Sequence, residues 1–211
     1  MMAIESSYPN PYLRLKEWLQ EARDNGLSEE AATAMLLSTV IPSSVPGQQA
    51  RPRSRIVLLK KLDERGLVFF TNFNSDKAQE LAQCSAAALC FFWPSLGKQI
   101  RLEVDVVRLS EAESAEYFAQ RPRMSQIGAW ASKQSQVCTQ QELEARVQEM
   151  TERFAGVSTI PKPPFWGAYL CQPLQIEFWH ERPYRLHQRD RYVFFPNTAW
   201  TQQWRAEQLF P

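Results

Sequence analysis

The segment 121–135, RPRMSQIGAWASKQS, contains side chains suited to holding an anion. It carries two arginines, a lysine, three serines and two glutamines around a short apolar stretch at 127–130. Cations, hydroxyls and carboxamides at this density suit a hydrogen-bonding anion such as a phosphate ester. A solvated, charged loop is the alternative, and this segment alone leaves both open.

A second candidate anion site is FTNFNSDK, residues 70–77. It ends a predicted strand, turns and begins a predicted helix, so free backbone N–H groups at 75–77 would join the Thr71 and Ser75 hydroxyls and the Lys77 ammonium. Simple capping of the helix is the alternative. Asp76 favours the helix dipole but would repel a bound phosphate, so the two interpretations conflict at this residue.

Basic side chains also mark two predicted strands, RIVLLK and RLHQR. Arg55 and Lys60 are an odd number of residues apart and should face opposite sides of a strand. Arg185, His187 and Arg189 alternate and should share one strand face, where they would repel one another without an anion or an electron-rich ligand. A strand with charged ends and an exposed edge strand are the respective alternatives.

The rest of the sequence, which must position these groups, predicts a protein made mainly of β-strands. Helices are predicted from capping and spacing at 11–26, 75–82, 110–118 and 139–154. Strands are predicted at 34–41, 55–61, 67–72, 87–93, 98–109, 166–171, 174–180 and 191–195, with loops at 42–52 and 161–164. The strands follow one another like hairpins and no glycine-rich phosphate loop is present, which favours an antiparallel sheet, most simply a barrel.

Composition narrows the class of protein. The 211 residues are 44% hydrophobic and 22% charged with net charge +1, which is ordinary for a globular protein and gives no global field for nucleic acid. Four scattered cysteines and two histidines argue against a metal site or a disulfide framework. With no leader-like or membrane-spanning apolar run, we expect a cytoplasmic protein without membrane or nucleic-acid partners.

The ordered motifs RIVLLK, FTN…SxK, W-x5-Q, YF-x2-RPRxSQIGAW…QS, FWG, QIEFW and RLHxR resemble the pyridoxine/pyridoxamine 5′-phosphate oxidase family over residues 9–211. The resemblance implies one α+β domain, 1–211: an antiparallel FMN-binding split β-barrel. Residues 1–26 would form an N-terminal extension and helix, and 165–211 a C-terminal dimerisation and active-site region. It also implies a homodimer with an active site at each subunit boundary.

The same resemblance implies a reaction. Pyridoxine or pyridoxamine 5′-phosphate would be oxidised to pyridoxal 5′-phosphate, with FMN as cofactor and O₂ as acceptor, releasing H₂O₂ and, from the amine, NH₃. Two alternatives remain open: a split-barrel oxidase for another ring compound, such as a phenazine precursor, and an FMN- or pyridoxal-phosphate-binding protein with weak or no oxidase activity.

Site residues follow by motif position. The resemblance implies that Gln134 and Ser135 reach FMN from the partner subunit and that Arg185 and His187 are catalytic. FMN contacts are implied for Arg55, Ile56, Val57, Leu58, Leu59, Lys60, Phe70, Thr71, Lys77, Gln99, Gln134, Ser135, Trp179 and Arg189. Substrate contacts are implied for Lys60, Tyr117, Arg121, Ser125, Arg185 and His187.

The chain departs from the family pattern at several positions. Asp76 stands where an arginine usually binds the FMN phosphate, and Phe70 replaces a frequent tyrosine. Val104 stands at a usual glycine, Gln188 replaces an aspartate, and the 42–52 loop is longer than usual. Because Asp76 replaces a cation with an anion, it should weaken FMN binding if it faces the phosphate.

Overall fold

One antiparallel sheet organises the computed structural model, which describes residues 10–42, 49–196 and 202–211. The nine-stranded sheet has the order β2-β1-β5-β6-β7-β4-β3, with β8 paired to β7 and β9 paired to β8. The strands are β1 Ala34–Ile41, β2 Arg51–Leu58, β3 Lys61–Asp63, β4 Gly66–Asn72, β5 Ala86–Trp93, β6 Lys98–Arg108, β7 Trp166–His180, β8 Gln188–Pro196 and β9 Gln202–Gln208.

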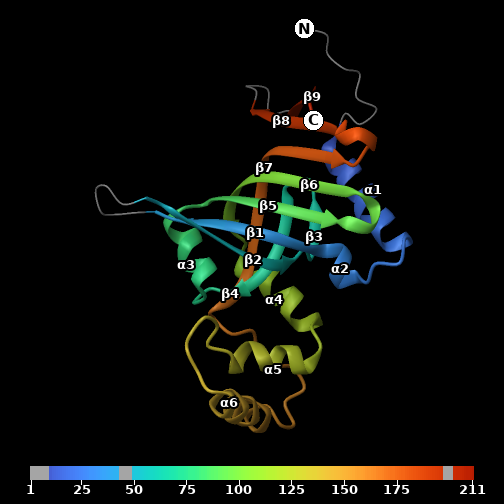
Figure 1. Cartoon of the computed structure of the whole chain (residues 1–211). Coiled ribbons are helices and arrows are strands. Elements are labelled where there is room, and N and C mark those ends of the chain that lie inside the picture. Colours follow the sequence, from blue (N-terminus) through green and yellow to red (C-terminus); the bar gives the residue numbers. More distant parts are fainter. Residues whose placement is uncertain (1–9, 43–48, 197–201) are drawn as a thin grey trace.

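The long strand β7 gives the sheet its shape (Figure 1). Its first part pairs with β4 from Trp166 to Cys171, and its last part pairs with β8 from Gln175 to His180. The strand bends between these parts, and β2 and β3 remain the unjoined ends of the strand order. The sheet therefore curves without closing, which confirms the predicted split barrel.

The helices begin where the sequence supplies caps. Their bounds are α1 Pro11–Asp24, α2 Glu29–Thr33, α3 Asp76–Gln83, α4 Glu111–Gln120, α5 Arg123–Ala131 and α6 Gln140–Arg153, with short 3₁₀ turns at Pro94–Leu96 and Pro183–Arg185. The Asn10 side chain caps α1, and capping boxes open α4 at Ser110 and α6 at Thr139.

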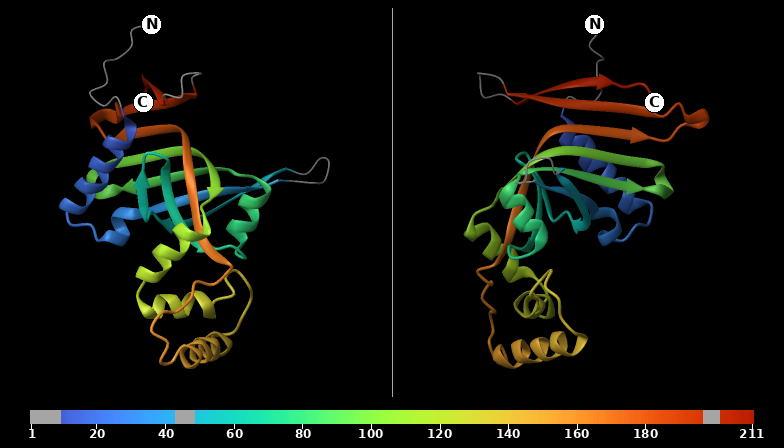
Figure 2. Two further views of the ribbon diagram at one scale, coloured as in Figure 1. Left: turned by 180° about the vertical axis from the view of Figure 1, so that it is seen from behind. Right: turned by 60° about the vertical axis from the view of Figure 1, so that its left-hand side comes forward.

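The two larger of three apolar clusters among the described residues hold these elements together. The main core joins the sheet to α1, whose Trp18 ring meets Phe178 edge-on at 5.2 Å. A second core lies among the helices α4, α5 and α6, where Phe118, Ile127 and Met150 are buried. Figures 1 and 2 show α5 and α6 at the end of the molecule opposite β8 and β9.

Several predicted elements need correction. Segment 121–135, which was assigned no helix or strand, contains helix α5, Arg123–Ala131. The strands predicted at 166–171 and 174–180 are one strand, β7, and β2 starts at Arg51 inside the predicted 42–52 loop, whose residues 43–48 lie outside the described part. Helix α2 and strand β9 were missed.

The predicted alternation of β6 is confirmed: Ile100, Leu102, Val104 and Val106 are buried. The pairing of β6 with β7 is irregular between Glu103 and Val104. Val104 fills this position with a core side chain that is 2% exposed. No helix among the described residues is both long and apolar enough to cross a membrane.

Candidate functional site

A cavity of about 250 Å³ opens at the split in the barrel, between β2 and β4. A second cavity of about 250 Å³ shares Lys60, Phe70 and Tyr117 with it, so the two form one extended cleft. The first cavity is lined by Ile56, Val57, Leu58, Lys60, Phe70, Thr71, Lys77, Tyr117, Arg121, Gln134 and Trp166. We call Thr71, Lys77, Tyr117, Arg121 and Gln134 the cleft cluster.

One part of the cleft cluster is Lys77, a buried residue that is 9% exposed. Its Nζ donates to Thr71 Oγ1 at 3.1 Å, Ser75 Oγ at 3.1 Å and Gln134 Oε1 at 3.2 Å. Burial, followed by the charge of Arg55, lowers the pKa of Lys77. All three hydrogen-bond partners are neutral. The nearby charges of Asp76 and Glu80 favour the ammonium, but among the described residues neither carboxylate forms an ion pair with it, so a bound anion could contact it directly.

The other end of the cleft cluster is Arg121, against an aromatic wall. Phe70 stacks on Tyr117 with ring centroids 3.9 Å apart, and the Arg121 guanidinium lies 4.8 Å from the Trp166 ring centroid. Burial lowers the pKa of Arg121. Among the described residues, Arg121 Nη1 is the buried side-chain polar atom that lacks a hydrogen-bond partner. Leaving such a donor unpaired is costly, so this geometry fits an anionic ligand.

The N-terminus of α3 lies beside Lys77. The Asp76 N–H donates to Ser135 Oγ at 3.2 Å, and Ser135 has a left-handed backbone with φ of 72°. The Asp76 carboxylate is paired with Arg53 at 3.2 Å. Ser135 and Gln134 thus adjoin α3 of their own chain.

A separate group of predicted site residues lies at the far end of β7. Register pairing places Gln99 of β6, Trp179 of β7 and Arg189 of β8 side by side. Arg189 donates from Nε and Nη2 to both oxygens of the buried Glu177, at 3.0 and 3.1 Å. Gln99, Trp179, His187 and Arg189 are called the strand cluster below.

His187 and Arg185 do not share a strand face with Arg189, so that prediction is wrong. Arg185 belongs to the 3₁₀ turn, and β8 begins only at Gln188. Tyr184 and Arg185 have φ of 59° and 60°, an unfavourable conformation for residues other than glycine. After this turn, His187 packs against the strand cluster, where its ring centroid lies 4.7 Å from that of Trp179.

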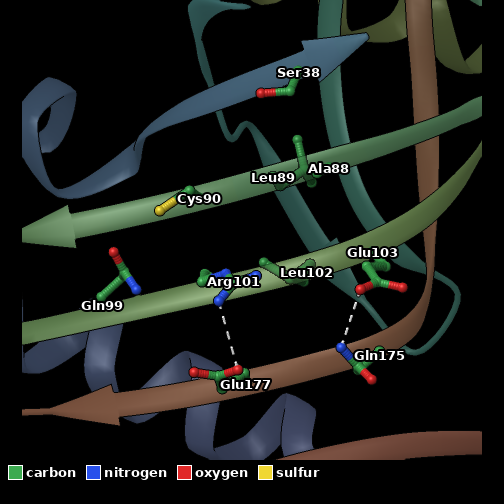
Figure 3. A pocket seen from close by; sticks show the side chains of 10 residues that line it. All are labelled: Ser38, Ala88, Leu89, Cys90, Gln99, Arg101, Leu102, Glu103, Gln175 and Glu177. Carbon is green, nitrogen blue, oxygen red and sulfur yellow. Dashed lines mark hydrogen bonds and ion pairs between the residues drawn. The ribbon is translucent and has the colours of Figure 1, made fainter. Parts of the chain in front are cut away.

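A further cavity of about 340 Å³ adjoins the strand cluster on the sheet face formed by β1, β5, β6 and β7 (Figure 3). Gln99 lines it, and Arg101 reaches Glu177 across the strands at 3.8 Å. The same Glu177 carboxylate that orients Arg189 therefore also meets this cavity.

The structure leaves some predicted contacts outside the cleft. Leu59 is a buried core residue whose N–H donates to Thr33 O at 2.9 Å, and Ser125 lies in the first turn of α5 without lining the cavity. Arg55 pairs with Glu80 at 2.7 Å behind Lys77.

The sequence analysis missed three residues that shape the site: Arg53, Trp166 and Glu177. Trp166 and Glu177 lie inside the motifs FWG and QIEFW, so the motifs contained the signal. Arg53 gave none, because its importance depends on where α3 packs.

The cleft cluster and the strand cluster lie at opposite ends of β7. Thr71 pairs with Gly167 near the beginning of that strand, and Trp179 stands near its end. At about 3.3 Å per residue, roughly 40 Å of strand path separates these positions. Figures 1 and 2 show the bend of β7 between them.

The open antiparallel sheet with a cationic cleft between β2 and β4 places the protein in the split-barrel class. Comparison with known families assigns residues 25–154 to the family described as pyridoxamine 5′-phosphate oxidase, and 166–211 to the pyridoxine 5′-phosphate oxidase C-terminal dimerisation region. The chain belongs to the pyridoxine/pyridoxamine 5′-phosphate oxidase family of enzymes.

Individual similar proteins support this family assignment. The chain is 42% identical over 202 residues to the pyridoxine/pyridoxamine 5′-phosphate oxidase of Brucella canis, covering 95% of this chain and 94% of that protein. It is 29% identical to PhzG of Burkholderia lata, solved with tetrahydrophenazine-1-carboxylic acid, with a TM-score of 0.85 over 98% of this chain and 95% of that chain. An FMN-binding, pyridoxamine 5′-phosphate oxidase-related protein of Nostoc punctiforme shares the fold at 18% identity, with a TM-score of 0.70 over 96% of this chain and 98% of that chain.

Proposed function

We propose that the protein is an FMN-dependent oxidase that converts pyridoxine or pyridoxamine 5′-phosphate into pyridoxal 5′-phosphate. The observation that carries this proposal is that two cationic side chains, Lys77 and Arg121, line one cleft. Lys77 keeps its charge among neutral oxygens, and Arg121 has a buried donor without a partner. Two anion sites fit a cofactor and a substrate that each carry a phosphate.

Each end suits one of these phosphates. Thr71, Lys77, Gln134 and Ser135 would hold the FMN phosphate at the start of α3, with Ile56, Val57 and Leu58 along the flavin. Tyr117 and Arg121, with Lys60 on the shared wall, would hold the substrate phosphate. Phe70 stacks on the Tyr117 ring and fixes its position. Phenylalanine in place of the more frequent tyrosine at position 70 would therefore still hold Tyr117 beside the substrate phosphate.

FMN when bound would accept a hydride from C4′ of the substrate. Oxidation of the alcohol removes two electrons and two protons, which O₂ takes up as H₂O₂, and oxidation of the amine also consumes water and releases NH₃. The chain contributes position and charge: the cleft fixes the phosphates, and the aromatic wall excludes water. Arg185 and His187 would orient the substrate ring from the strained turn.

The strand cluster would complete the site from a second copy of the chain. Gln99, Trp179, Arg189, Arg185 and His187 stand at the end of β7 away from the cleft. The match of 166–211 to a dimerisation region supports a homodimer in which each cleft meets the partner's strand cluster.

The test uses the purified full-length protein. Its visible spectrum is recorded with and without added FMN, pyridoxine 5′-phosphate is supplied in air, and aldehyde and peroxide are measured. Equal yields of the two products support the proposal. A colourless protein that FMN does not reconstitute, or a yellow protein that forms no aldehyde from either phosphorylated substrate, would refute it.

The same assay separates two other functions. PhzG was solved with a phenazine carboxylic acid, so a reduced phenazine acid serves as a competing substrate. The Tyr117 and Arg121 end of the cleft favours a phosphorylated substrate. Flavin binding without turnover of any of these compounds would point to a binding protein.

A further inference from the structure

Asp76 presents a problem for phosphate binding at the start of α3. It directly precedes Lys77, and its own N–H donates to Ser135 Oγ at 3.2 Å. A carboxylate at this position stabilises the helix but repels an incoming dianion. Something must offset that repulsion if the Lys77 end of the cleft is to accept a phosphate.

Arg53 meets this carboxylate from the neighbouring strand. It lies on β2 two residues before Arg55, so both side chains leave the same face of the strand. Arg53 Nη1 donates to Asp76 Oδ2 at 3.2 Å and to Glu80 Oε1 at 3.2 Å. Arg55 Nη2 donates to the other Glu80 oxygen at 2.7 Å. Two arginines of β2 thus hold two carboxylates of α3.

The charge balance of this group depends on Arg53. In the described part of the chain, Arg53, Arg55 and Lys77 face two carboxylates, Asp76 and Glu80, so this group keeps one net positive charge. Without Arg53 that excess would vanish, and Asp76 would face the phosphate position uncompensated. Among the described residues, only Nη1 of the Arg53 guanidinium is engaged, so its Nε and Nη2 donors remain for a ligand.

We propose that Arg53 determines the preference of this protein for phosphorylated flavin. It turns Asp76 away from the phosphate and adds its own charge to that of Lys77. This proposal rests on the proposed function, because it concerns the same FMN site. Arg53 is 52% exposed at its side chain, so its effect should be moderate and sensitive to solvent screening.

The experiment compares the dissociation constants of FMN and riboflavin, which differ by the phosphate alone. Arg53→Gln should weaken FMN binding about five- to tenfold and leave riboflavin binding unchanged, since half-exposed charges act through partial screening. Asp76→Asn should tighten FMN binding. The double variant should return close to the wild-type preference, because it restores one net positive charge.

Arg51→Gln is the matched control, an exposed arginine on the same strand. It should leave both dissociation constants unchanged. The proposal is overturned if Arg53→Gln leaves the ratio of the two constants unaltered, or if it weakens FMN and riboflavin equally, which would mean a structural role only. If the wild-type protein binds riboflavin but shows no preference for FMN, this proposal fails while flavin binding stands. If it binds neither, the proposed function fails as well.

Discussion

The cleft cluster and the strand cluster differ in whether their charged side chains are paired. In the cleft, Lys77 contacts only neutral oxygens and Arg121 keeps an unpaired donor. In the strand cluster, both Arg189 donors that face Glu177 are already paired, and Arg189 Nη1 donates to Phe210 O at 3.1 Å. One region offers unbalanced charge, and the other offers an oriented, nearly neutral surface of rings and amides.

From this difference we expect each cluster to serve a different part of a ligand. Buried cationic groups without a contacting carboxylate suit phosphates, because a bound anion offsets the free-energy cost of removing the cation from water. Trp179, His187 and Gln99 offer flat faces and a carboxamide, which suit a planar ring system. Since the clusters lie at opposite ends of β7, a ligand with both a phosphate and a ring system would need both, one from each of two chains.

The largest expected effect tests whether each site combines the cleft cluster of one chain with the strand cluster of the other. Arg121→Gln and Arg189→Gln should each be nearly inactive alone. If the two variants are mixed, unfolded and refolded together, activity should return to about a quarter of wild type, because half of the random dimers would carry one intact site of two. The measurement is peroxide release. No recovery above the separate variants would mean that both clusters serve a site in the same chain.

The next effect concerns the unpaired donor. Arg121→Gln should raise the KM for pyridoxine 5′-phosphate about 100-fold, the loss expected for charge-assisted bonds to a phosphate, with little change in FMN retention. Arg121→Lys is the matched variant and should recover part of the loss. An equal loss of FMN and substrate binding would contradict the separation of the two ends of the cleft.

A smaller effect should follow from Glu177→Gln. Loss of the bidentate partner frees Arg189, so FMN should bind about tenfold more weakly, and the flavin reduction potential should shift because the charge near the ring changes. Glu103→Gln, an exposed carboxylate on the same sheet, is the control. Unchanged affinity and potential in Glu177→Gln would show that Arg189 does not depend on this pair.

The smallest effect is the pH dependence of phosphate recognition. Because the pKa of Lys77 is lowered by burial, this ammonium should lose its proton at a lower pH than a free lysine, and the FMN-over-riboflavin preference should decline as pH rises toward that lowered pKa. The second ionisation of the phosphate, with a pKa near 6, is largely complete above about pH 7 and contributes little to a change at higher pH. Lys77→Arg, which stays charged, should flatten the profile between about pH 7 and pH 10. A profile that is the same in both proteins would exclude Lys77 as its cause.

Much of the fold could be predicted because it depends on sequence patterns that extend over only a few neighbouring residues. The caps at Asn10, Ser110 and Thr139 and the alternation of β6 act over a few residues, and all appear in the structure. The turn at Arg185 could not be predicted, because two residues adopt a backbone conformation that their own types disfavour. Alternation alone therefore gave the wrong face for Arg185 and His187.

Hydrophobic period and caps by themselves determined the antiparallel sheet, because they are properties of neighbouring residues. The order of the motifs, through the family resemblance, implied that the barrel is split and which side chains could hold two phosphates. Only the tertiary structure decided which cations stay unbalanced. Arg53 meets Asp76, Glu177 holds Arg189, and Arg121 remains unpaired because distant segments pack together. The net charge at each point depends on those contacts rather than on the residues alone.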